Sequence, residues 1–158
     1  MTDMTTGARR ISDRALEVTR LVNGPVHLVW RAWTTPDLFR QWWLPRSMGM
    51  TLLACDMDVR EGGRYRLAFA TDPVMEFFGT YLEVAPNARL VWTNDEGADS
   101  VTTTALFEDR GGTTLVTLRD TYASKAALDR AMAEGSSGMA DGMPEQFGQL
   151  DDLLAAQG

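Results

Sequence analysis

A histidine, a cysteine and several carboxylates are the side chains of this sequence that could carry out acid–base or nucleophilic chemistry. A Ser-His-Asp or Cys-His arrangement would need His27, the single histidine, as its base. The apolar face of a short predicted helix is formed by Val26, Val29, Trp30 and Trp33. His27 falls off that face, so we predict a solvent-exposed histidine and no catalytic residue of this kind.

Carboxylates gather between residues 56 and 61, where a metal site has to be considered. Asp56, Asp58 and Glu61 offer oxygen ligands, but no second histidine or cysteine joins them and the spacing of a calcium-binding loop is missing. Asp58 and Arg60, two residues apart on a predicted strand, project to the same face and can form an ion pair. We favour a structural role for this pair, inside the fold or on its solvent side; burial of the pair would instead indicate a role in orienting a ligand or in fixing the strand register.

Motifs for cofactors are missing as well. Gly62-Gly63 is not followed by the lysine and the helix of a phosphate-binding loop, and we interpret it as a turn or a bulge. A single cysteine, Cys55, excludes an intrachain disulfide and a cysteine-rich zinc site, and its apolar neighbours indicate a small buried side chain. We expect no zinc, haem or nucleotide cofactor, and this cysteine usage fits the reducing cytoplasm.

Composition sets the remaining limits. The chain has 158 residues, of which 44% are hydrophobic and 23% charged, which is typical of one globular domain. Its formal net charge of −7 repels phosphate backbones, so nucleic acid is not an expected partner. No stretch is long and apolar enough to span a membrane, and residues 1–14 lack the apolar centre of a signal peptide. We predict a flexible N-terminal tail over 1–14 and a single domain over 15–158.

Two periodicities predict the elements that position these groups. Leu16 and Val18 alternate with polar residues over 15–21, which is typical of a half-buried strand. Two short helices follow, the first beginning at Pro25 and the second at Thr35-Pro36. Further strands are predicted near 51–60, 64–70, 76–84, 88–94, 100–108 and 113–120. Their connections are too short for parallel crossovers, so we predict an antiparallel meander.

A helical pattern returns near the C-terminus. Ser124 is a suitable N-cap for a helix over 124–134, and a glycine- and serine-rich break at 135–138 separates it from a final helix ending near Ala156. That final helix carries an apolar stripe made of Met139, Met143, Phe147, Leu150 and Leu154. We expect the sheet to cover this stripe.

This order of elements resembles the START-like, or SRPBCC, superfamily, and several motifs sharpen the resemblance. They are VWRAWTTP at 29–36, QWWLP at 41–45, DVREGGRY at 58–65, GTYLEVAP at 79–86, RLVWT at 89–93, GTTLVTL at 112–118 and the final helix from 138 to 154. Together they resemble the family named for the activator of the ninety-kilodalton heat-shock protein's ATPase. The resemblance extends from Leu16 to Ala156.

The resemblance implies an α+β helix-grip fold, in which a curved antiparallel sheet wraps around the long C-terminal helix and encloses an apolar cavity. Leu44 and Met139 replace the glycine and the tryptophan more common in the family, and we expect both to alter the cavity mouth. The candidate ligand-binding residues are Trp42, Trp43, Tyr65, Phe69, Tyr81, Trp92, Met143 and Phe147. Each is also a natural core residue, so lining a cavity and packing a core both stay open.

The function that we expect is non-catalytic binding of a small, largely apolar molecule between the sheet and the C-terminal helix. An enzyme of polyketide cyclase, aromatase or lyase type is an alternative, with Asp58, Arg60 or Tyr81 assisting proton transfer. A chaperone-associated interaction module is another, suggested by the family name, although the chain has no room for a separate chaperone-binding domain. A homodimer is compatible with the sequence.

Overall fold

The computed structural model describes residues 9–43, 49, 51–71, 73–95, 101–133 and 138–157, with the side chains of 138–144 and 157 left out. Eight strands and four helices occupy this part of the chain. The strands are β1 (Arg9–Arg10), β2 (Ala15–Val22), β3 (Leu52–Met57), β4 (Arg64–Phe69), β5 (Met75–Ala85), β6 (Arg89–Asn94), β7 (Val101–Asp109) and β8 (Thr114–Tyr122). The helices are α1 (Val26–Thr34), α2 (Pro36–Trp42), α3 (Lys125–Ala133) and α4 (Gly138–Gln157).

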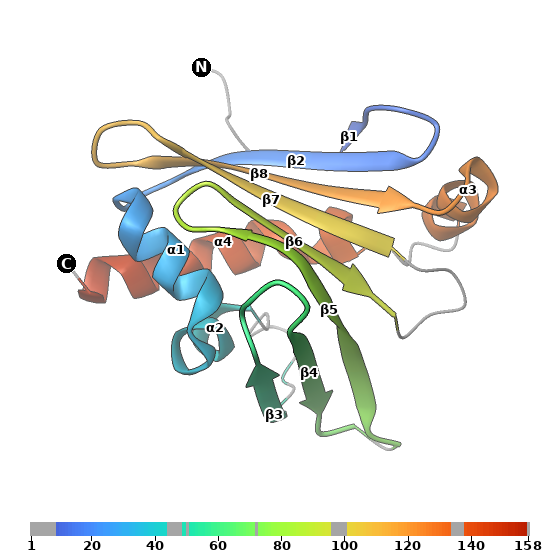
Figure 1. Cartoon of the computed structure of the whole chain (residues 1–158), viewed down its shortest axis with the longest axis horizontal. Coiled ribbons are helices and arrows are strands. Elements are labelled where there is room, and N and C mark those ends of the chain that lie inside the picture. The colour runs from blue at the N-terminus through green and yellow to red at the C-terminus, as the bar shows by residue number, and fades with distance from the viewer. Residues whose placement is uncertain are drawn as a thin grey trace.

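The strands form one antiparallel sheet in the order β1-β2-β8-β7-β6-β5-β4-β3. Strands from β3 to β8 are therefore a meander, and β2 closes it by pairing along its whole length with β8. Helix α4 lies behind the sheet, and α1 and α2 lie at the end of the sheet where α4 ends (Figure 1). The predicted α+β helix-grip fold and the antiparallel meander are confirmed. No helix in the described part of the chain is long and apolar enough to cross a membrane.

The two short helices start where proline and the turn residues direct them. Pro25 is extended and serves as the N-cap of α1, so the first helical residue is Val26 and not Pro25 as predicted. Thr35 is the N-cap of α2 and Pro36 its first residue, as predicted, with Asp37 in the first turn to favour the helix dipole. The Thr35 side chain makes no capping hydrogen bond. The single extended residue between the two helices turns the chain sharply and brings α2 against α1.

Strand alternation places the core on the concave face of the sheet. Val18 of β2 pairs with Leu118 of β8, and both are buried on the side facing α4. From α4, the described part of the predicted stripe is buried too: Phe147, Leu150 and Leu154 are at most 3% exposed. The side chains of Met139 and Met143 lie outside the described residues. The helix and the sheet thus bury each other's apolar faces.

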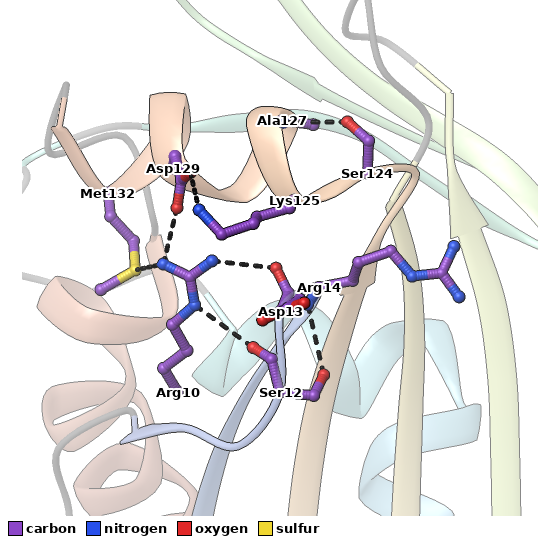
Figure 2. Close-up of polar contacts among 9 residues, drawn as sticks. All are labelled: Arg10, Ser12, Asp13, Arg14, Ser124, Lys125, Ala127, Asp129 and Met132. Atoms are coloured by element: carbon purple, nitrogen blue, oxygen red, sulfur yellow. Dashed lines mark hydrogen bonds and ion pairs between the residues drawn. The ribbon is translucent and has the colours of Figure 1, made fainter.

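The segment before β2 is tied to α3 by polar contacts (Figure 2). Arg10 of β1 forms an ion pair with Asp129 at 2.7 Å, and Lys125 contacts the same carboxylate at 2.8 Å. The Ser124 hydroxyl accepts a hydrogen bond from the Ala127 N–H at 3.0 Å, which confirms the predicted N-cap. Residues 9–14, which we assigned to a flexible tail, therefore form a short strand and a turn with partners on α3.

Truncation of Phe147 tests the packing of α4 on the sheet. The ring is 1% exposed, and the Arg20 guanidinium lies 5.6 Å from its centroid. We expect Phe147→Ala to lower the free energy of unfolding by about 3–5 kcal/mol, measured by urea titration. Leu53→Ala, at a side chain that is 57% exposed, is the control and should change it by less than about 0.5 kcal/mol. Similar losses in the two variants would contradict this packing.

Candidate functional site

An apolar cavity lies between the concave face of the sheet, from β3 to β6, and the two short helices. Its volume is about 60 Å³. A single water needs about 10–15 Å³ on this measure, so the cavity has room for several. The lining consists of Trp33, Phe39, Trp43, Met57, Tyr65, Leu67, Phe77, Tyr81, Leu90, Trp92 and Asn94.

Aromatic rings from α1 and α2 form one wall. The Phe39 ring stacks on the Trp43 ring at 4.9 Å between centroids, and Trp33 meets Trp43 edge to face at 5.8 Å. Trp33 also lies 6.0 Å from the Trp92 ring of β6, which joins this wall to the sheet. Trp33 and Trp92 are buried, whereas Trp43 is partly exposed. Trp43 is therefore one of the lining residues in contact with solvent, as are Met57, Phe77 and Asn94.

Helix α4 supports this wall from behind. The Gln149 side-chain amide donates to the Trp42 carbonyl at 2.9 Å, and that of Gln146 donates to the Trp43 carbonyl. Both glutamines are buried, and the two carbonyls belong to the end of α2, where helix carbonyls lack partners in their own helix. The Trp42 indole N–H donates to the Ala32 carbonyl at 2.9 Å, which locks α2 to α1. Helix α4 thus contributes to the cavity by positioning α2.

Two glycines bring the opposite wall into place. A Cβ on Gly79 would lie 1.9 Å from the Thr93 carbonyl oxygen, so only glycine lets β5 approach β6 so closely. Gly62 has a φ of +83°, and the Gly62-Gly63 turn exchanges two backbone hydrogen bonds of 2.8 Å with Tyr81. The predicted turn is confirmed, and it holds the Tyr81 side chain toward the cavity. Tyr81 then lies beside Tyr65, with 5.7 Å between ring centroids.

A chain of polar side chains leads from the cavity along the concave face of the sheet. The Tyr65 hydroxyl donates to the Thr93 carbonyl at 2.7 Å and lies 3.1 Å from Asn94 Oδ1. The Asn94 amide donates to Thr103 Oγ1 at 2.8 Å, and the Thr103 hydroxyl donates to Asp120 Oδ1 at 2.6 Å. Four strands, from β4 through β6 and β7 to β8, contribute to this chain.

Burial changes the ionisation of two groups in this region. It raises the pKa of Asp120 to about 6, against the opposing effect of the Thr103 hydrogen bond. It also raises the pKa of Tyr81 well above its ordinary value, with smaller contributions from Cys55 and Asp58. Tyr81 is therefore a neutral phenol at physiological pH, and Asp120 changes charge in weakly acidic solution.

The candidate ligand-binding residues separate into two groups. Those that line the cavity are Trp43, Tyr65, Tyr81 and Trp92, and those that are buried elsewhere are Trp42, Phe69 and Phe147. The side chain of Met143 lies outside the described residues. None of the described side chains of α4 lines the cavity: Phe147 packs beside Arg20 of β2, whereas the cavity lies against β3–β6 toward the other edge of the sheet.

Apart from Tyr81, the candidate chemical groups do not line the cavity. Strand β3 ends at Met57, not near residue 60 as predicted, so Asp58 and Arg60 lie in the following turn. They form an ion pair at 2.9 Å with both side chains more than half exposed, which places the pair on the solvent side. His27 is exposed, as predicted. Within the described residues no three histidine, cysteine or acidic side chains converge as a metal site would require.

The sequence interpretation missed the polar chain. Asn94, Thr103 and Asp120 each continue the inward phase of an apolar strand, two residues after Trp92, two before Ala105 and two after Leu118. A polar residue in an apolar phase is a usable signal, because burial without a partner is costly. Following that phase across neighbouring strands would have grouped the three residues.

Replacing Asp120 tests its buried ionisation. The carboxyl has a pKa of 3.8 when unperturbed and about 6 in the fold, so the folded protein holds its proton more tightly. The stabilisation that comes from this tighter proton binding is complete below pH 4. It is lost as the pH rises through about 6, and the total loss is up to about 3 kcal/mol. The free energy of unfolding of Asp120→Asn relative to the parent, measured by urea titration, should therefore rise by up to that amount as the pH is raised from 4 to 8. A difference that does not vary with pH would contradict the assignment.

Comparisons with known proteins agree with this architecture. A family model described as Activator of Hsp90 ATPase homolog 1-like protein matches residues 23–155. The crystal structure of a Rhodobacter sphaeroides protein is 25% identical and superposes with a TM-score of 0.83, over 96% of this chain and 98% of that chain. A Nitrosomonas europaea protein, at 24% identity and a TM-score of 0.79, covers 94% and 98% of the two chains.

A further solved structure, an AHSA1-like protein from Aeromonas hydrophila, shares the fold at 20% identity and a TM-score of 0.66, over 89% of this chain and 94% of that chain. Among curated proteins no match is found. The family match covers most of the chain, and the helix-grip architecture accompanies it. This chain belongs to the family of Activator of Hsp90 ATPase homolog 1-like proteins, within the START-like superfamily.

Proposed function

We propose that the protein binds a small, largely apolar molecule in the cavity between β3–β6 and the helices α1 and α2. The observation that carries this proposal is the lining itself, in which aromatic and aliphatic side chains surround a space open to solvent. Small-molecule sites are commonly concave, mostly apolar and equipped with a few polar groups, and this cavity has Asn94 and two tyrosines.

We propose that the ligand enters past Trp43. Trp43 is partly exposed at the end of α2, whereas Trp33 behind it is 1% exposed. The cavity, at about 60 Å³, is too small for a ring compound, so we propose that Trp43 moves outward when the ligand enters.

We propose binding without catalysis because the candidate proton-transfer groups are poorly suited to catalysis at the cavity. Tyr81 is the candidate proton donor or acceptor within the lining, and burial raises its pKa away from the range of a base at neutral pH. Asp58 and Arg60, the other candidates, pair with each other on the surface. The thiol of Cys55 is free and partly buried, in keeping with the cytoplasmic location that we propose.

Two tryptophan substitutions test the proposal by comparison. The neutral fluorescent probe N-phenyl-1-naphthylamine should bind the parent protein with a Kd of about 1–10 µM. Trp43→Ala removes a lining ring and should weaken binding at least about tenfold in fluorescence titrations. Trp30→Ala is the matched control, since Trp30 is also partly buried but packs on Phe107 at 5.5 Å outside the lining. It should lower stability and leave the Kd within about twofold.

Either of two results would overturn the proposal. One is the absence of saturable probe binding to the folded parent protein. The other is an equal weakening of binding by Trp43→Ala and Trp30→Ala, which would place the probe outside the cavity.

A further inference from the structure

The polar groups at the cavity are arranged in a way that restricts the ligand. Asn94 is the single side-chain amide in the described lining, and both of its N–H donors are used, one on the Val101 carbonyl at 3.0 Å and one on Thr103 Oγ1 at 2.8 Å. The amide is therefore held in one orientation, with Oδ1 as its remaining polar atom. Asn94 presents an acceptor and no donor.

Thr103 and Asp120 hold that orientation. The Thr103 hydroxyl has one proton, which it donates to Asp120 Oδ1 at 2.6 Å, so its oxygen accepts from Asn94. Thr103 is 5% exposed, and a reversed amide would place two acceptors against each other in a buried site. Thr103 is a positioning residue for Asn94.

Asn94 Oδ1 has capacity for a second partner. The Tyr65 hydroxyl lies 3.1 Å from it, but the single proton of that hydroxyl has a nearer acceptor, the Thr93 carbonyl at 2.7 Å. A carbonyl oxygen accepts two hydrogen bonds, so the partly exposed Asn94 Oδ1 can take another donor beside the Tyr65 hydroxyl. A donor on a bound molecule would satisfy it.

Tyr81 supplies the complementary group. Its side chain is 4% exposed and lines the cavity, and its hydroxyl makes no hydrogen bond to another described residue, although its oxygen is not one of the fully buried atoms without a partner. A hydroxyl at the cavity surface that makes no hydrogen bond within the protein can donate to or accept from a ligand atom. Tyr81 and Asn94 project from neighbouring strands on the same face, since Tyr81 pairs with Trp92, two residues before Asn94.

Charge excludes other ligand classes. The described lining includes no lysine, arginine or histidine, and no acidic side chain. A carboxylate or a phosphate bound here would be a buried charge without a counter-ion, which is strongly unfavourable. The remaining lining is aromatic or aliphatic, which suits a flat apolar ring.

We propose, on the basis of the proposed function, that the ligand is a neutral ring compound with a hydroxyl group. The ligand hydroxyl donates to Asn94 Oδ1 and accepts from the Tyr81 hydroxyl, while the ring packs against the tryptophans. A hydroxyl satisfies both protein groups at once because it is both a donor and an acceptor.

Three naphthalenes of similar size test this assignment by isothermal titration calorimetry: 2-naphthol, 2-methylnaphthalene and 2-naphthoate. We expect 2-naphthol to bind about tenfold more tightly than 2-methylnaphthalene, the size of one or two net hydrogen bonds, and 2-naphthoate to bind most weakly. Tyr81→Phe should weaken 2-naphthol about three- to tenfold and leave 2-methylnaphthalene unchanged.

Two threonines on one strand test the positioning role. Thr103 and Thr104 are adjacent on β7, both at most 8% exposed, and their side chains point to opposite faces of the sheet. Thr103→Val should abolish the preference for 2-naphthol over 2-methylnaphthalene, and Thr103→Ser should retain it. Thr104→Val, the same change on the other face, should leave the preference intact.

The outcomes separate the two proposals. Equal affinities for 2-naphthol and 2-methylnaphthalene, or tightest binding of 2-naphthoate, would overturn the hydroxyl assignment while cavity binding stands. If none of the three compounds bound the folded protein, cavity binding itself would be overturned, and the assignment with it.

Discussion

The packing of Trp33 is the interaction on which the rest of the site depends. Its ring contacts Trp42 and Trp43 of the α2 segment, Trp92 of β6 and Phe107 of β7, with centroid distances from 4.8 to 6.0 Å. One side chain thus joins both short helices to the sheet. This position has a cost, because the buried indole N–H has no hydrogen-bond partner among the described residues. Aromatic contacts and burial of the large ring offset it.

The aromatic cluster around Trp33 is held in place by α4 on one side and faces the sheet on the other. Toward α4, the end of α2 is held by side-chain amides that satisfy its last carbonyls, so the long helix fixes the position of the aromatic wall. Toward the sheet, the glycine turns let β4, β5 and β6 bend until Tyr65 and Tyr81 face the same wall. The cavity is the space that these two rigid surfaces leave between them.

The sequence predicted the fold well because its signals are local. Strand alternation, proline at helix starts and short connections are each decided within a few residues, and they gave nearly all elements within a few residues of their bounds. The error at β3 arose because Asp58, Val59 and Arg60 continue an alternating pattern after the strand has ended at the turn before Gly62-Gly63. Pattern alone does not show where pairing with a neighbour stops.

The site was less predictable because it depends on distances between strands. Trp43 and Phe147 are both aromatic candidates for the cavity lining, yet of the two only Trp43 lines it, since Phe147 packs beside Arg20 of β2 and the cavity lies against β3–β6. Asn94, Thr103 and Asp120 belong to three strands and meet only through the register of the sheet. The register between strands cannot be predicted from a local sequence pattern, although each polar residue at an inward-facing position can be recognised in the sequence.

Nuclear magnetic resonance of the indole N–H groups tests the central claim most directly, because the chain has five tryptophans and each gives one signal. Three of them, Trp33, Trp43 and Trp92, line the cavity, whereas Trp30 packs outside it. On titration with N-phenyl-1-naphthylamine, the account predicts shifts in the signals of the three lining tryptophans and none in that of Trp30. Shifts confined to Trp30, or no shift in any lining tryptophan at saturating probe, would contradict it.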